Sequence, residues 1–143
     1  MKTIIFDFNR TLYNPDTEAL VPGVRELLGE LTAQGHELHL ISRLEPGRAV
    51  TLKELGIADI FATTAFVTDK AAAISRILNE KTSDVYVVGD YLYDEIRAGN
   101  RAGAKTIWFR RGKFFDLAPE TVHDHPWRTA EDMAGVRAAL FED

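Results

Sequence analysis

Residues 3–12 read TIIFDFNRTL, a short apolar run rich in β-branched and aromatic residues that meets the acidic residue Asp7. Such a run predicts a buried β-strand with a carboxylate at its end. Similar runs follow along the chain at 37–41, near 60–67, at 85–88 and at 105–109. Segments with helical spacing of apolar residues separate them, an alternation typical of βα units around a parallel sheet. We therefore expect a three-layer α/β/α fold, doubly wound and Rossmann-like, with a mostly parallel five-stranded sheet.

The predicted helices lie between and after these strands. In the first, Val24, Leu27, Leu28 and Leu31 recur at helical spacing until Gly35 ends the pattern. The other helices are expected at about 46–55, from 69 onward, at 94–102 and at about 130–141. The run Val85–Val88 has no polar interruption, which indicates a central strand buried on both faces.

Composition narrows the possible classes of protein. The 143 residues include 45% hydrophobic residues and suffice for one domain, which we expect to span 1–143. Cysteine is absent, so disulfide bonds and thiolate chemistry are excluded. The net charge of −5 gives no basic footprint for nucleic acid. Neither an apolar stretch of ~20 residues nor a signal-peptide pattern occurs, so we expect a cytoplasmic protein that does not act at a membrane.

Polar residues at the strand ends are the candidates for chemistry. Asp7, Ser42, Lys70 and Asp90 each follow a predicted strand, and Asp94 lies one helical turn beyond Asp90. Because parallel strands place their carboxyl ends at one edge of the sheet, we expect these side chains to converge. Carboxylates suit a hard divalent cation, whereas a hydroxyl and an ammonium group suit phosphoryl oxygens. The set therefore predicts phosphoryl transfer.

Four segments resemble the motifs of the haloacid dehalogenase-like (HAD) superfamily, in order and at suitable spacing. They are Ile4–Leu12, His39–Ser42, Lys70 and Val88–Glu95. The resemblance implies a HAD-like hydrolase core that forms a phosphoaspartyl intermediate on its nucleophile, Asp7. It further implies that Ser42, Arg43 and Lys70 hold the phosphoryl oxygens. The implied cofactor is Mg²⁺, and its implied ligands are Asp7, the backbone carbonyl of Asn9, Asp90 and Asp94.

Asn9 departs from the pattern of the superfamily's phosphatases. The resemblance implies an aspartate at this position, which would act as general acid and then as general base. An amide cannot exchange a proton with the leaving group or with water, and such catalysis commonly contributes ~10²–10⁴-fold. We therefore expect a weakened phosphatase that favours acyl and aryl phosphates. The alternative is a pseudoenzyme that serves as a phosphate-binding or protein-interaction module. A signalling receiver is disfavoured, because it would need an acidic pair after the first strand.

The chain leaves no room for the cap domain that covers the site in many members of this superfamily. Only Leu12–Val21 separates the first strand from the first helix, and the 28 positions from Ser42 to Lys70 are filled by a helix and a strand. An open site is expected for a phosphorylated substrate that is macromolecular, or for a homo-oligomer in which a neighbour covers it. Trp108–Phe115 mixes cations with aromatics on the same edge, and its role is left open.

Overall fold

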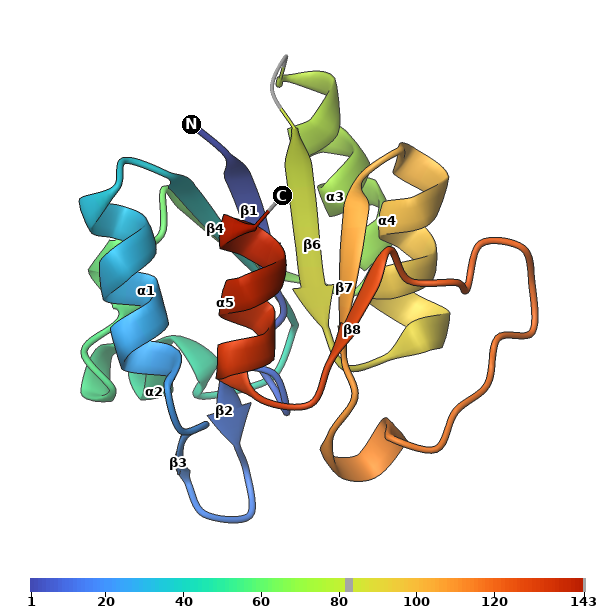
Figure 1. Cartoon of the computed structure of the whole chain (residues 1–143). Coiled ribbons are helices and arrows are strands. Elements are labelled where there is room, and N and C mark those ends of the chain that lie inside the picture. The colour runs from blue at the N-terminus through green and yellow to red at the C-terminus, as the bar shows by residue number, and fades with distance from the viewer. Residues whose placement is uncertain (82–83, 143) are drawn as a thin grey trace.

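The computed structural model describes residues 1–81 and 84–142. Its centre is a parallel sheet with strand order β5-β4-β1-β6-β7-β8 (Figure 1). The chain moves outward from β1 in one direction and then in the other, which confirms the doubly wound arrangement. The strands are β1 (Thr3–Phe6), β4 (Glu37–Arg43), β5 (Thr63–Val67), β6 (Val85–Gly89), β7 (Lys105–Phe109) and β8 (Arg128–Ala130).

The sheet has six strands, so the expectation of five was wrong. The sixth strand, β8, is a three-residue edge strand whose Ile107↔Arg128 and Phe109↔Ala130 pairs join it to β7. Two of its residues are exposed, so it lacks the apolar run that marks a buried strand. This strand also moves the start of the last helix from Ala130 to Met133, where the side chain of Asp132 caps it.

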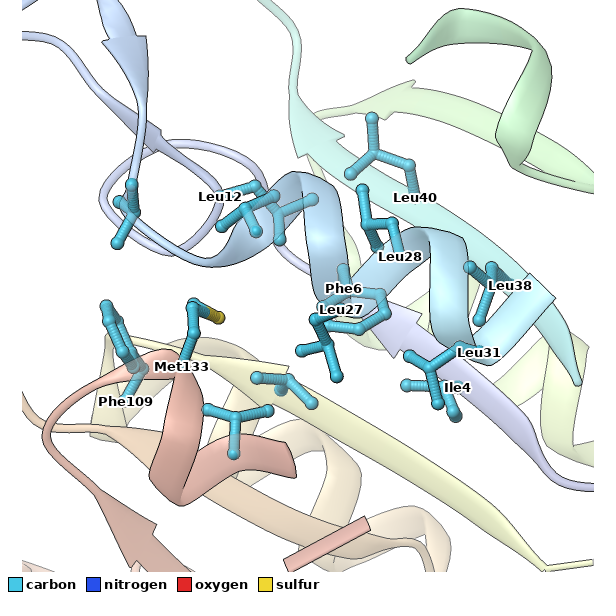
Figure 2. Close-up of a cluster of buried hydrophobic side chains, with 14 of the residues drawn as sticks. Ile4, Phe6, Leu12, Leu27, Leu28, Leu31, Leu38, Leu40, Phe109 and Met133 are labelled. Atoms are coloured by element: carbon cyan, nitrogen blue, oxygen red, sulfur yellow. The ribbon is translucent and has the colours of Figure 1, made fainter. Parts of the chain in front are cut away.

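Helices cover both faces of the sheet. On one side lie α1 (Val24–Ala33), α2 (Arg48–Glu54) and α5 (Met133–Phe141), and on the other lie α3 (Lys70–Asn79) and α4 (Arg97–Ala102) (Figure 1). Because side chains alternate along a strand, Ile4 and Phe6 pack beneath the first group while Ile5 packs beneath the second. Figure 2 shows the first cluster, in which Leu27, Leu28 and Leu31 of α1 meet the β1 side chains.

Short elements complete the connections between the strands and helices. They are the hairpin of β2 (Tyr13–Asn14) and β3 (Ala19–Leu20), the 3₁₀ turns at Ala58–Ile60 and Gly112–Phe114, and a π-helical turn at Leu92–Ile96 that leads into α4. Within the described residues, no inserted domain separates β1 from α1 or β4 from α3. No helix in that part of the chain has the length and apolar character needed to cross a bilayer.

Candidate active site

The predicted strand-end residues meet at one edge of the sheet. Asp7 directly follows β1 and Asp90 directly follows β6, while Lys70 is the first residue of α3. Ser42 lies within β4 rather than after it, because pairing of β4 with β5 extends to Arg43. The backbone N–H of Asp7 donates to the carbonyl of Val88 at 3.0 Å, so Asp7 is held by the sheet on a rigid backbone.

Lys70 is the buried cation of the site. Its Nζ lies 2.8 Å from Asp7 Oδ1, 3.2 Å from Glu95 Oε2 and 3.7 Å from Asp94 Oδ2. Burial by itself would lower the pKa of this ammonium group, but the charges of Asp7 and Glu95 outweigh it and raise the pKa above its ordinary value. Lys70 therefore stays charged and can hold either the Asp7 carboxylate or a phosphoryl oxygen beside it.

Three buried carboxylates form a compact cluster around Lys70. Asp7, Asp90 and Glu95 each offer an oxygen within 4.8 Å of the others. Asp90 Oδ2 is buried and has no hydrogen-bond partner among the described residues. Burial, followed by the charges of Asp7 and Glu95, raises the pKa of Asp90. A buried oxygen without a partner, within a cluster of hard oxygen donors, fits a divalent cation such as Mg²⁺, which would let these carboxylates ionise together.

Glu95 belongs to this cluster, although sequence reasoning passed over it in favour of Asp94. Its Oε1 accepts hydrogen bonds from the backbone N–H groups of Asp90 and Tyr91, both at 3.1 Å. A Cβ atom at Gly89 would lie 2.2 Å from the Glu95 side chain, so only glycine lets the carboxylate approach. Glu95 lies in a π-helical turn, Leu92–Ile96, so a projection that assumes a regular α-helix does not predict which way its side chain points.

Asp94 lies at the rim of the same site. Its Oδ2 accepts a hydrogen bond from the Arg43 guanidinium at 3.2 Å, and the Arg43 side chain is 60% exposed. The structure thus brings Asp94 and Arg43 to the cavity, but places Glu95 rather than Asp94 among the three clustered carboxylates. A metal-binding role for Asp94 and a phosphate-binding role for Arg43 stay predictions.

A second buried cation, Arg48, supports Ser42 and was not anticipated. Arg48 donates to Ser42 Oγ at 2.7 Å, forms an ion pair with Glu45, and lies over the ring of Phe8 with 5.1 Å between guanidinium and ring centroid. Its side chain is only 8% exposed, whereas most arginines lie at the surface. The sequence signal was weak, because Arg48 opens α2 six residues beyond Ser42 and belongs to none of the recognised motifs.

The cavity lined by Asp7, Lys70, Asp90 and Glu95 has a volume of about 190 Å³. Ser42, whose side chain is fully buried, is not among the described residues that line it. Asn9 and Arg10 line it on the β1 side. Tyr91 and Phe114 also line it, and their rings stack at 4.1 Å. Phe114 comes from the Trp108–Phe115 segment, which therefore contributes to the wall of the site.

Two aromatic side chains beside the cavity have structural partners. Trp108 donates from Nε1 to the carbonyl of Asp90 at 2.9 Å, which fixes the loop that carries this carboxylate. The hydroxyl of Tyr93 donates to the carbonyl of Ala118 at 2.6 Å. The Trp108 hydrogen bond therefore helps to position Asp90, whereas the Tyr93 hydrogen bond anchors the long loop that follows β7.

Comparisons with known proteins identify the family and the fold. Residues 63–136 match a family model described as HAD-hydrolase-like. A glyceraldehyde 3-phosphate phosphatase from Methanopyrus kandleri is 42% identical over 52 residues, which are 36% of this chain and 22% of that protein. The chain thus matches only about a fifth of the length of that curated relative.

Two solved structures share the fold over nearly the full length of both chains. An uncharacterized protein from Listeria monocytogenes serotype 4b has a TM-score of 0.79 at 20% identity, with 99% of this chain and 98% of that chain covered. A D,D-heptose 1,7-bisphosphate phosphatase from B. bronchiseptica, complexed with magnesium and phosphate, has a TM-score of 0.72 at 19% identity, with 99% of each chain covered.

Proposed function

The chain belongs to the HAD-hydrolase-like family, and on that premise we propose that it is a Mg²⁺-dependent phosphohydrolase that acts through a phosphoaspartyl intermediate on Asp7. The observation that carries the proposal is the setting of Asp7. This carboxylate is 5% exposed, stands at the end of the central strand β1 and is held by Lys70. It therefore lies at the one edge of the sheet where cations and carboxylates converge.

The first step in this proposal is attack of an Asp7 carboxylate oxygen on the phosphorus of the substrate. The new bond joins Asp7 to phosphorus while the bond from phosphorus to the leaving oxygen breaks, and that oxygen departs with the electron pair. Lys70 and Arg43 line the cavity and offer donors for the phosphoryl oxygens. Ser42 stays a predicted donor, although its fully buried hydroxyl accepts a hydrogen bond from Arg48 and is not among the described groups that line the cavity. Water then attacks phosphorus, which releases inorganic phosphate and restores the Asp7 carboxylate.

Mg²⁺ would be held by Asp7, Asp90 and Glu95, with Asn9 and Asp94 at the edge of the same cavity. When bound, it would neutralise part of the negative charge that the phosphoryl group brings to these carboxylates. Lys70 would add to this neutralisation, because its ammonium group already pairs with Asp7 Oδ1. The positive charge of Lys70 then reduces the repulsion between the Asp7 carboxylate and the phosphoryl group that it attacks.

Asn9 sets the expected substrate preference. Asn9 lines the cavity where the leaving group and the attacking water must pass, yet its amide can neither give nor take a proton. Acyl and aryl oxygens depart without protonation, so their phosphates should react faster than alkyl phosphates. Hydrolysis of the phosphoaspartate should also be slow, because no base at this position activates the water.

The similar proteins support phosphorylated small molecules as the substrate class. The M. kandleri relative is named for a triose phosphate, and the B. bronchiseptica structure for a sugar bisphosphate. Since the match to the first covers 22% of that protein, neither substrate is assigned to this chain. The expectations of a macromolecular substrate and of a homo-oligomer stay predictions.

A phosphate-release assay tests the proposal. Wild type and Asp7→Asn are compared on p-nitrophenyl phosphate and acetyl phosphate, with Mg²⁺ and with a chelator. The proposal predicts release that needs both Asp7 and Mg²⁺. The absence of release from wild type, together with tight binding of inorganic phosphate, would instead favour the phosphate-binding pseudoenzyme that Asn9 suggests. Release that survives in Asp7→Asn would exclude Asp7 as the nucleophile.

A further inference from the structure

The active-site cavity adjoins a larger one. This second cavity has a volume of about 420 Å³, and Arg10 lines both. The turn Gly112–Phe114 also faces both, because it gives Phe114 to the active site and Lys113 to the second cavity. Small-molecule sites commonly measure ~300–1,000 Å³, so the active-site cavity alone, at about 190 Å³, has room for the reacting group but little more.

The second cavity is lined by an excess of positive charge. Arg10, Arg111 and Lys113 face it, whereas Asp16 is the one carboxylate among the described residues that line it. Within residues 1–81 and 84–142, none of these three cations forms an ion pair with a carboxylate. Their charge is therefore available to an anion that enters from outside.

The floor of the second cavity is apolar. Val21 is 6% exposed and Phe109 is 1% exposed, and both line it. A low-dielectric floor strengthens the attraction between the cations at the rim and a bound anion. Cations at the rim and apolar side chains at the floor suit a ligand that has an anionic group next to a short apolar segment.

Arg10 pays a conformational penalty to occupy its position. Its backbone has a φ of 62°, in the left-handed region that residues with a Cβ rarely adopt. Such strain clusters at functional sites. A glycine would remove the strain, so the arginine side chain between the two cavities points to a use for its charge.

We propose that the second cavity binds a second anionic group of the substrate, a phosphate or a carboxylate. The preferred substrates are then small molecules with a reacting phosphoryl group at one end and another anion at the other. Arg10 lies between the two groups, while Arg111 and Lys113 hold the distal one. This inference rests on the proposed function and defines its substrate class.

Calorimetric titration with non-hydrolysable phosphonates tests the subsite in the wild-type chain, with Mg²⁺ in excess. The probes are short alkane bisphosphonates, the matching monophosphonates and the matching carboxyalkyl phosphonates. A charge-assisted hydrogen bond adds about tenfold in affinity or more, so the bisphosphonate should bind at least that much more tightly than the monophosphonate. The carboxylate probe shows which anion the cavity prefers.

The double variant Arg111→Gln/Lys113→Gln should remove this preference. The matched control Arg76→Gln/Arg101→Gln loses the same charge from exposed positions on α3 and α4 and should retain it. Equal affinity of the wild type for mono- and bisphosphonates, or a preference that survives in the double variant, would overturn the subsite. Turnover of p-nitrophenyl phosphate is measured separately, so failure of the subsite is distinguished from failure of the proposed function.

Discussion

Lys70 Nζ lies 2.8 Å from Asp7 Oδ1, although 63 positions separate the two residues in the chain. Asp7 directly follows β1 and Lys70 begins α3. The contact exists because β5 runs parallel to β4 and β1, so the short turn from β5 into α3 lies at the same edge of the sheet as the end of β1. Both side chains are buried, at 5% and 9% exposed. Such a pair is stable only as a pair, since removing either partner leaves a buried charge without compensation.

The carboxylate cluster should make the stability of the fold depend on Mg²⁺. In its absence Asp90 has a raised pKa, so the fold at neutral pH must either protonate this group or bear repulsion from Asp7 and Glu95. Asp90→Asn should raise the free energy of unfolding without metal by about 1–3 kcal/mol. Wild type should gain about 2.7 kcal/mol when Mg²⁺ is at a hundred times its dissociation constant, and the variant should gain little.

Thermal unfolding with Mg²⁺ and with a chelator measures both effects. Asp59→Asn, a change of an exposed carboxylate away from the site, is the control and should keep the wild-type response. A Mg²⁺ response in Asp90→Asn equal to that of wild type would show that the metal binds elsewhere.

Restoring a carboxyl group at Asn9 should repair acid–base catalysis. We expect Asn9→Asp to raise the turnover of alkyl phosphates by ~10²–10⁴-fold and that of aryl phosphates much less. The ratio of kcat for the two substrate types is the measurement, and Asn79→Asp, outside the site, is the control. Equal effects on both types would show that leaving-group protonation is not what Asn9 lacks.

Replacing Arg10 by glycine should stabilise the fold and weaken the binding of bisphosphonates. In Arg10→Gly the φ of 62° is no longer strained, so the free energy of unfolding should rise by about 1 kcal/mol, with a Tm increase of about 3 °C. Glu18→Gly, at the other strained position with φ 54°, should stabilise similarly. Only the Arg10 variant should lose affinity for bisphosphonates, as calorimetry can show. If Glu18→Gly lost the same affinity for bisphosphonates, the cause would be the change in backbone conformation and not the loss of the arginine charge.

Asp124, which is not among the described residues lining the active-site cavity, should contribute to acid sensitivity. Its fully buried side chain accepts two hydrogen bonds from Arg97, at 2.6 and 2.9 Å, and others from the backbone of Glu120 and Thr121. These bonds, that from Arg97 foremost, hold the pKa of Asp124 well below its ordinary value. Its stabilisation is thus present above the ordinary carboxyl pKa of about 3.9 and is lost as the pH falls below it.

Asp124→Asn should cost about 2–3 kcal/mol at neutral pH, because the amide cannot accept all of these bonds. Its unfolding free energy should also fall less steeply than that of wild type between about pH 5 and pH 2. Denaturant unfolding across that range measures both values. Glu131→Gln removes an exposed carboxylate that has one long contact with Arg110, at 3.9 Å, and should follow the wild-type profile.

The regular part of the fold was predictable because it rests on local patterns. Apolar runs and helical spacing placed β5, β4, β1, β6, β7 and the helices. Parallel pairing then brought Asp7, Lys70 and Asp90 to one cavity, with Ser42 buried beside it on β4. The edge strand β8 was missed because it is short and half exposed. Its pairing with β7 depends on a long-range contact that no local pattern encodes.

The missed site residues have a common physical reason. Glu95 enters the cluster because a π-helical turn changes which face of the segment points inward and because Gly89 leaves space for it. Arg48 is buried because Ser42 and Glu45 on β4 and its following loop satisfy its guanidinium group. Both depend on three-dimensional partners, whereas the motifs that identified the other residues are contiguous in the sequence.

The central claim is that Asp7 carries the phosphoryl group, and rapid acid quenching followed by peptide mass spectrometry tests it most directly. Because Asn9 supplies no base to hydrolyse the intermediate, wild type mixed with acetyl phosphate and Mg²⁺ should accumulate one phosphoryl group on the peptide that contains Asp7. Asn9→Asp should accumulate less, and Asp7→Asn none. Phosphate release from wild type without any covalent phosphoryl group on Asp7, or with one on another residue, would contradict the mechanism.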